Sequence, residues 1–372
     1  MKEVLEYTEE ELRNLSTAEL EVLAQQAEAL EGLWNTSQLV AKTLMNSLYG
    51  AMANKWFPLF NEQMAAAITG NGRYFIQKLA FYIEETLQQM IKNDKPYVIA
   101  GDTDSVYYQI EPFMDLYQKK NPGLSINEYV NWADNFEKKV IQPVIQRAID
   151  DVARDLNAYN KSVIGAEREI ISDAAVFVAK KKYFARVRDS EGTRYPDDEP
   201  YIKITGLEII RSSTPKWAQV HLKKSIPHIL DKDEIDLKNW INEIKKQYTR
   251  TNLNDLAMVG SASRIDYELT DKGIPIASRA VICYNNYIKE NNLVDRYAPI
   301  QAGDKAKRIF LTEPNPFNSN IVSFNNENFI KELEQYIDFD TNFEKGFLNP
   351  MGLMVAPLNY NLKKETETLD EW

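Results

Sequence analysis

The sequence predicts an α+β protein with more than one structural unit, and three observations lead to this class. The 372 residues exceed what one hydrophobic core usually holds. Long stretches with apolar side chains at helical spacing alternate with short runs typical of β-strands. A hydrophobic share of 44% and a mean hydropathy of −0.45 are typical of a folded, soluble protein. No apolar run reaches the roughly 20 residues that span a bilayer, so we expect no membrane partner and no secretory signal.

The first part of the chain is expected to be a helical arm. Thr8–Glu11 and Ser16–Glu19 both fit the capping box, in which a hydroxyl and a carboxylate satisfy N–H groups at a helix start. The second box begins an apolar stripe of helical period, and after Gly32 we expect another helix over residues 36–54. Residues 62–92 show the same period and predict a further long helix.

The middle of the chain mixes strands and helices. Residues 97–100 and 106–110 are strand-like and flank a polar turn, which predicts a hairpin with carboxylates at its tip. Residues 127–158 are helical in character, and residues 176–187 and 201–207 resemble strands. A new unit is expected after Ser212, with Thr214 as helix N-cap and Pro215 in the first helical position.

The charge of the chain is unevenly distributed. The net charge of −11 argues against a nucleic-acid partner, because such partners usually meet basic domains. However, Lys2–Glu31 carries nine acidic and two basic residues, whereas Val178–Lys224 carries eleven basic and six acidic residues. The second stretch could therefore bind a phosphate backbone while the first faces solvent.

The residue types available limit the metal chemistry of the chain. One cysteine, Cys283, excludes an internal disulfide framework, and two histidines, His221 and His228, exclude the usual zinc constellations. A metal would have to be held by carboxylate oxygens, which suit magnesium or manganese.

The best candidate for such a site is the turn Gly101–Ser105. In extended chain Asp102 and Asp104 point to the same side, so their carboxylates can share divalent cations. An ordinary acidic turn is the alternative explanation. A calcium loop of the EF-hand type is excluded, because Val106 and Tyr107 stand where an oxygen ligand and glycine are required.

A second candidate site is the helix that contains Lys42, Asn46 and Tyr49. Their spacing of i, i+4 and i+7 places a cation, an amide and an aromatic ring on one helix stripe, along which a nucleotide could lie. Gly50 beside Tyr49 leaves room for a base pair. The alternative is a solvated lysine and a tyrosine of the core.

Together, the Lys42–Gly50 helix and the later Gly101–Ser105 hairpin resemble motifs B and C of family B DNA polymerases. Lys180–Tyr183, Gly206–Glu208 and Ser212–Lys216 resemble the tailed-phage replicative branch of that family. The resemblance implies a right-hand polymerase with a palm of antiparallel sheet and helices, a helical fingers arm and a mainly helical thumb. The implied domains are half of the fingers in residues 1–55, the palm in 56–206, the thumb in 207–360 and a clamp-binding tail in 361–372.

The resemblance also implies roles for individual residues in DNA-directed DNA synthesis. Asp102 and Asp104 would be the catalytic carboxylates for two Mg²⁺ ions, or Mn²⁺, with Glu169 as a further family carboxylate near the metals. The dNTP would be bound by Lys42, Asn46, Tyr49 and Gly50, and primer-template DNA by Lys180, Lys181, Tyr183, Thr214 and Lys216. Leu369 and Trp372 in the acidic tail would contact the sliding clamp.

The family's first motif, a strand aspartate followed by Ser-Leu-Tyr-Pro-Ser, does not occur in this sequence. The exonuclease motifs and the arginine-bearing fingers helix are missing as well. We therefore expect a separate polypeptide to supply these parts, as in a naturally split polymerase, or else a longer parent chain. The expected location is the cytoplasm of a bacterial host. A catalytically silent DNA- and clamp-binding fragment is the alternative function.

Overall fold

The structure is a computed structural model that describes residues 7–160 and 164–362. It divides into two compact units, of which the first comprises Met1–Asp115 and Lys138–Ala166, and the second Leu116–Glu137 and Glu167–Trp372. Both combine helices with antiparallel strands, which confirms the predicted α+β class. The division into fingers, palm, thumb and tail stays a prediction. None of the described helices is long and apolar enough to cross a membrane.

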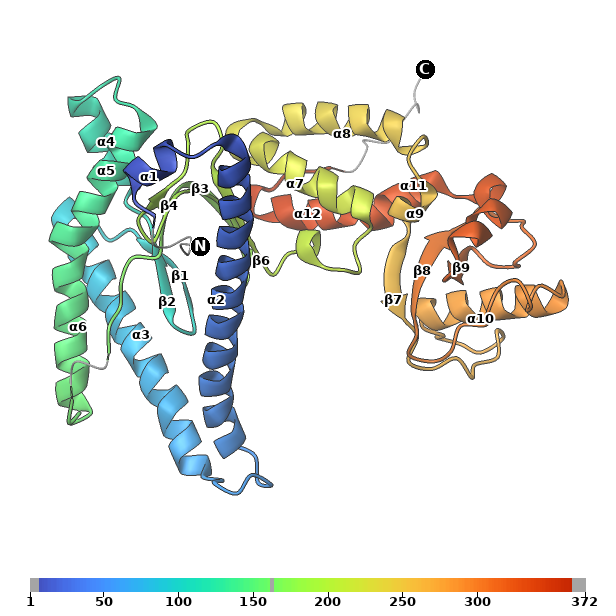
Figure 1. Cartoon of the computed structure of the whole chain (residues 1–372), viewed down its shortest axis with the longest axis horizontal. Helices are drawn as coiled ribbons and strands as arrows, with labels where there is room; N and C mark the ends of the chain where they lie inside the picture. Colours follow the sequence, from blue (N-terminus) through green and yellow to red (C-terminus); the bar gives the residue numbers. More distant parts are fainter. Residues whose placement is uncertain (1–6, 161–163, 363–372) are drawn as a thin grey trace, which may run out of the picture. The chain divides into compact units, whose positions relative to one another are not determined.

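The first unit begins with a short helix and two long ones, labelled in Figure 1. Helix α1 spans Glu9–Arg13, α2 spans Thr17–Met52 and α3 spans Glu62–Ile91. Both predicted capping boxes are present, at Thr8 and Ser16. The predicted helix break at Gly32 is wrong, because α2 runs through it without interruption. One helical glycine costs only about 1 kcal/mol relative to alanine, and good helix formers flank it.

The core of the first unit lies between α3 and α6, which spans Gln142–Asp155 (Figure 1). Helix α6 has a strongly one-sided apolar stripe, which is the pattern that packs against another helix. The buried side chains are Leu79, Tyr82, Ile83 and Leu87 on α3 and Val144, Ala148, Ile149 and Val152 on α6. At the edge of this contact, Tyr82 donates to Asp151 at 2.5 Å and Lys78 pairs with Asp155 at 3.0 Å. By contrast, α2 buries none of its residues.

A two-stranded hairpin completes the first unit. Strand β1 (Val98–Asp102) pairs with β2 (Ser105–Tyr108), as the sequence predicted within two residues at each end. Helix α4 (Glu111–Lys120) follows and was not predicted. The region expected to be helical over 127–158 consists of α5 (Ile126–Phe136), a π-helical turn and α6.

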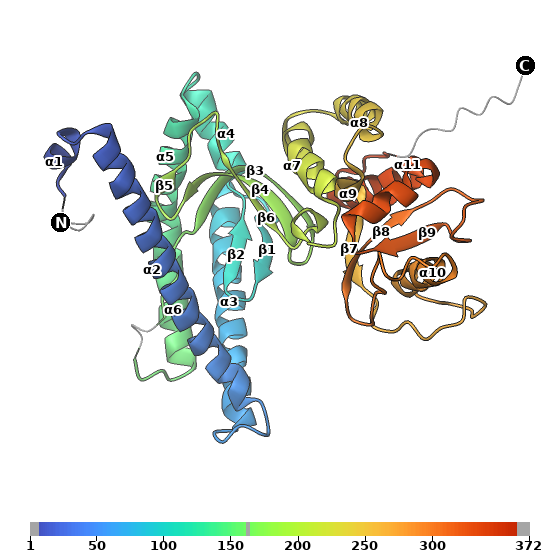
Figure 2. The same cartoon turned by 45° about the vertical axis from the view of Figure 1, so that its right-hand side comes forward.

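The second unit contains two antiparallel sheets. In the larger one, β4 (Lys182–Ser190) lies between β3 (Ile170–Ala179) and β6 (Tyr201–Thr205), and β5 (Thr193–Arg194) extends it. The predicted single strand over 176–187 is therefore wrong, because the chain reverses at Lys180–Lys181. The smaller sheet has the order β7 (Met258–Ser261), β8 (Lys305–Phe310) and β9 (Ile321–Phe324), with α10 (Ile276–Glu290) packed against β9 (Figure 2).

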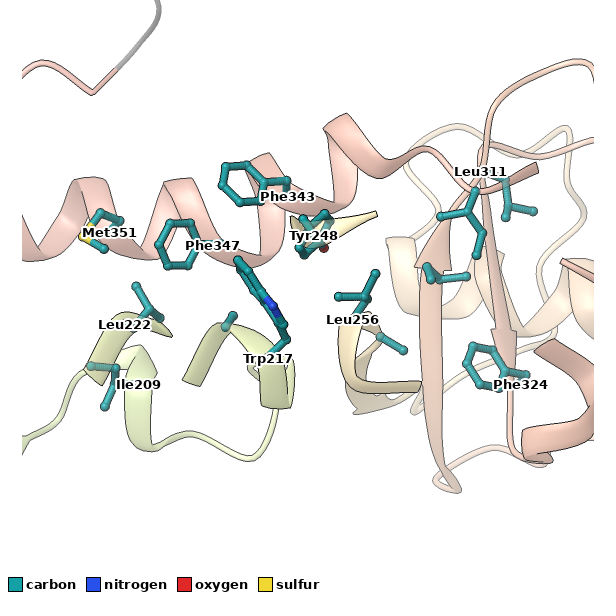
Figure 3. Packing of buried hydrophobic residues seen from close by; sticks show 14 of the residues in the cluster. Ile209, Trp217, Leu222, Tyr248, Leu256, Leu311, Phe324, Phe343, Phe347 and Met351 are labelled. Carbon is teal, nitrogen blue, oxygen red and sulfur yellow. The ribbon is translucent and has the colours of Figure 1, made fainter. Parts of the chain in front are cut away.

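Helices around Trp217 form the core of the second unit. The helices are α7 (Lys216–Asp231), α8 (Glu234–Tyr248), α9 (Leu253–Leu256), α11 (Phe339–Phe343) and α12 (Asn349–Val355). The Trp217 ring lies 4.7 Å from Tyr248 and 5.4 Å from Phe347 between ring centroids (Figure 3). Burial of several large aromatic rings in one cluster supplies much of the apolar area that stabilises such a unit.

Candidate active site

The acidic turn lies at the tip of the β1–β2 hairpin. Asp102 pairs with Ser105 across the hairpin, so the turn itself consists of Thr103 and Asp104. Thr103 has a φ of 48°, a left-handed value that is uncommon for a residue other than glycine. Asp104 is exposed in the turn, and its N–H donates to the Asp102 carbonyl at 2.5 Å. The expected extended geometry of the pair is therefore wrong at Asp104, although both carboxylates belong to the tip.

Glu84 of α3 anchors this hairpin, and sequence reasoning missed it. Its carboxylate accepts N–H groups of Tyr97 at 2.9 Å and Val98 at 2.6 Å, together with the amide of Gln88 at 3.0 Å. These bonds fix the start of β1 to the helix, since a carboxylate that accepts backbone N–H groups forms strong bonds. A glutamate in a long amphipathic helix gives no sequence signal for such a role.

Two carboxylates suit a hard divalent cation, but they do not complete a site by themselves. In residues 7–160 and 164–362, no three Asp, Glu, His or Cys side chains cluster in a way that could hold a metal ion. Glu169, the third carboxylate expected, lies in the second unit and is exposed. It pairs with Lys203 at 2.5 Å, and that hydrogen bond raises the pKa of the lysine against the lowering effect of burial.

The predicted nucleotide-binding residues all lie on α2, in the same unit as the acidic hairpin. Lys42, Asn46, Tyr49 and Gly50 are exposed, so the explanation of Tyr49 as a core residue does not hold within this chain. The helix places the first three on one stripe, as their spacing requires. A Cβ atom at Gly50 would have no atom within 4 Å, so the surface beside Tyr49 is open.

The predicted DNA-binding residues lie in the second unit and fall into two groups. Lys180 and Lys181 form the exposed turn between β3 and β4, with a φ of 62° at Lys181. Tyr183 is buried on β4 and stacks on Phe177 at 5.2 Å, because β4 is the central strand of its sheet. The strand expected over residues 176–187 would have contained both Lys181 and Tyr183, but Lys181 lies in the turn before β4.

Gly206 supports this basic turn from the end of β6. It has a φ of 65°, and an added Cβ atom would lie 2.0 Å from the Lys181 carbonyl oxygen. A side chain at this position would push the turn away. In the sequence, Gly206 belongs to a segment that resembles the phage branch. The sequence does not show that the backbone at Gly206 lies so close to the backbone at Lys181.

The predicted cap at Thr214 is also wrong. Helix α7 begins at Lys216 with Pro215 as the N-cap, and no side chain caps its first turn. Thr214 is buried, and its hydroxyl donates to the Glu208 carbonyl at 2.6 Å. Lys216 is exposed and stays a candidate for phosphate contact. Leu369 and Trp372 of the predicted clamp-binding tail lie outside the described residues.

The first unit thus holds an acidic hairpin tip and a helix that carries a lysine, an amide and a tyrosine, which are groups that nucleotide-binding enzymes with divalent metals use. The sequence model of the family described as DNA polymerase family B matches residues 13–141, which include the hairpin and the helix. Residues 13–141 therefore carry the sequence features of this family. It is 31% identical to the DNA-directed DNA polymerase of Enterobacteria phage T4 over 96% of its length, and 29% identical to that of Escherichia phage RB69 over 97%.

These alignments cover only part of each relative. The chain spans 41% of the length of the T4 protein and 41% of the RB69 protein. A DNA polymerase of Pyramimonas orientalis virus is 31% identical over 31% of this chain and 9% of its own length. The family resemblance inferred from the two motifs is thereby confirmed, and the phage proteins extend it over nearly the whole chain.

Proposed function

We propose that this chain forms the catalytic C-terminal part of a DNA-directed DNA polymerase that acts in phage DNA replication in the host cytoplasm. In this reaction the primer 3′-oxygen loses its proton and forms a bond to the α-phosphorus of a dNTP, and pyrophosphate leaves. The observation that carries the proposal is that the acidic hairpin and the Lys42 helix occur together in the segment that matches the family.

In the proposed mechanism, Asp102 and Asp104 hold the divalent cations. Bound Mg²⁺ or Mn²⁺ would neutralise charge on the attacking and leaving oxygens. Lys42 would contact the triphosphate as a point charge, and Asn46 and Tyr49 would line the nascent base pair beside the open surface at Gly50. Glu84 holds β1 and thereby positions the hairpin tip. Asp102 is the last residue of β1 and Asp104 lies in the two-residue turn that follows, so the strand pairing positions both carboxylates.

The proposal includes partners outside this sequence. A polypeptide segment that bears the first palm aspartate and the exonuclease would complete the two-metal site, and the tail with Leu369 and Trp372 would dock on a sliding clamp. Lys180, Lys181 and Lys216 would contact primer-template DNA. The metal ligands support this part of the proposal. The described residues offer two carboxylates at the hairpin tip and no cluster of three potential ligands, so a further carboxylate from the partner segment would be needed.

The test is primer extension by this chain with and without a polypeptide that carries the first palm motif. We expect extension only from the combination.

Lys42→Ala should raise the nucleotide concentration that half-maximal single-turnover extension requires. It should leave primer-template affinity unchanged, because the exposed Lys42 contacts triphosphate rather than DNA. Lys55→Ala, which removes another exposed cation of the same unit, is the control. Binding of primer-template without extension by the combination would favour the alternative, a silent DNA-binding fragment.

A further inference from the structure

Arg308 on β8 differs from the other arginines that are not fully exposed. Its guanidinium forms no hydrogen bond or ion pair with any residue of the ranges 7–160 and 164–362, although the side chain is half-buried. The comparable arginines of the second unit all have partners. Carboxylates pair with Arg168, Arg186, Arg188 and Arg194, and Asn320 accepts from Arg279.

Partial burial removes some of the hydration of this cation. Burial lowers the pKa of the Arg308 guanidinium, and no carboxylate is close enough to oppose that effect. A charge that is partly removed from water normally has a partner of opposite charge or binds a ligand, since lost hydration must be replaced. Arg308 is therefore a cation without an anionic partner among the residues that the structure describes.

The guanidinium of Arg308 lies against the backbone of the neighbouring strand at Gly260, and we call this position its seat. Arg308 pairs with Met258 of β7, and its guanidinium extends along that strand to lie over Gly260. A Cβ atom at Gly260 would lie 2.5 Å from Nη1 of Arg308, so a side chain at this position would displace the end of the arginine. Strand β7 is at the edge of its sheet (Figure 2), and edge strands carry backbone N–H groups without strand partners that can add to an anion site.

The charges around this seat favour an anionic ligand. Lys305, at the end of β8 where it pairs with Ser261, is exposed and has no partner among the described residues. Two acids next to this strand have other partners. Glu327 pairs with Lys307 at 3.1 Å, and Asp304 accepts the N–H of Gln301 at 2.8 Å.

We propose that Arg308, seated over Gly260 and flanked by Lys305, binds a phosphate group of the nucleic-acid backbone. A guanidinium offers two parallel N–H donors to phosphate oxygens, and a contact of this kind positions DNA without reading its sequence. The inference rests on the proposed function, because it assigns a DNA contact to the second unit of a polymerase. Free phosphate has the same chemistry and is distinguished by experiment.

The test measures binding of the full chain to a fluorescent primer-template duplex over about 50–200 mM salt, without any DNA synthesis. Arg308→Ala should weaken binding several-fold and reduce the slope of log affinity against log salt by about 0.9, the value for one phosphate contact. Gly260→Ala keeps the charge but displaces the guanidinium, and should weaken binding in the same direction. Arg250→Ala removes an exposed arginine of the same unit and should leave the slope unchanged.

The proposal is overturned if Arg308→Ala and Gly260→Ala bind the duplex with the affinity and salt slope of Arg250→Ala. It is also overturned if inorganic phosphate, titrated at constant ionic strength, binds in an Arg308-dependent manner while duplex affinity does not depend on Arg308. Should Arg308→Ala unfold, Arg308→Lys keeps the charge and loses the paired donors, so a loss of affinity is still expected. Because only binding is measured, an Arg308-dependent duplex complex that extends no primer contradicts the proposed function and leaves this inference intact.

Discussion

Two hairpins of this molecule end in two-residue turns of opposite charge. In the first unit β1 and β2 meet at Thr103–Asp104, and in the second unit β3 and β4 meet at Lys180–Lys181. Each turn contains a non-glycine residue with positive φ, Thr103 in one and Lys181 in the other. Backbone strain of this kind persists only where the surroundings hold it, and it is common at functional sites.

The two hairpins are held in place differently. Strands β1 and β2 are short and partly exposed along their length, and side-chain bonds from Glu84 fix their base. Strand β4 is nine residues long and largely buried between two neighbours, and Gly206 fits against its turn. The acidic tip therefore depends on a few polar contacts, whereas the basic tip depends on packing.

The largest expected effect is that of Asp104→Ala on catalysis. In the complete polymerase it should lower primer extension by about a thousandfold, or about 4 kcal/mol of transition-state stabilisation, while the fold is unchanged because the side chain is exposed. Single-turnover extension rates measure this. Asp94→Ala removes an exposed carboxylate shortly before β1 and should have little effect. Near-normal extension by Asp104→Ala would refute the catalytic role of the turn.

Tyr183→Ala should mainly affect stability. The ring is 6% exposed and stacks on Phe177, so its removal should lower the free energy of unfolding by about 3 kcal/mol. Denaturant titration measures the loss. Lys180→Ala in the adjacent turn should change stability by less than about 0.5 kcal/mol and weaken DNA binding instead. Equal effects of both substitutions on stability would contradict the distinction between packing and surface in this hairpin.

Gly206→Ala should destabilise the basic tip by about 1–3 kcal/mol more than Gly192→Ala. Both glycines have positive φ, but only at Gly206 would a Cβ atom meet another atom, the Lys181 carbonyl oxygen. The difference between the two unfolding free energies therefore isolates the clash from the backbone strain. If the two variants lose equal stability, the close approach does not restrain the turn.

Glu84→Gln should have the smallest effect, about 1–2 kcal/mol, because neutral amide oxygen accepts hydrogen bonds more weakly than carboxylate. The amide protons of Tyr97 and Val98 should exchange faster with solvent, since both N–H groups donate to Glu84. Glu85→Gln, next to it on α3, serves as the control because the one ion pair of Glu85 within residues 7–160 and 164–362, to Arg147, is long at 3.9 Å. Unchanged exchange at both amides would show that β1 is held by its strand pairing alone.

The sequence by itself determined the α+β class, the long helices with their capping boxes, the acidic hairpin and the resemblance to the family. These features depend on local periodicity, on cap and turn chemistry and on short motifs, which neighbouring residues specify. The tertiary structure alone decided that Gly32 continues a helix, that Tyr183 and Thr214 are buried, and that Lys180–Lys181 is a turn. It also decided that Glu84 holds β1, that Gly206 approaches Lys181 and that Arg308 lies over Gly260 with no partner in the described part of the chain. Each of these depends on residues that are distant in sequence or on the packing around a position, and local sequence carries no record of which segments meet.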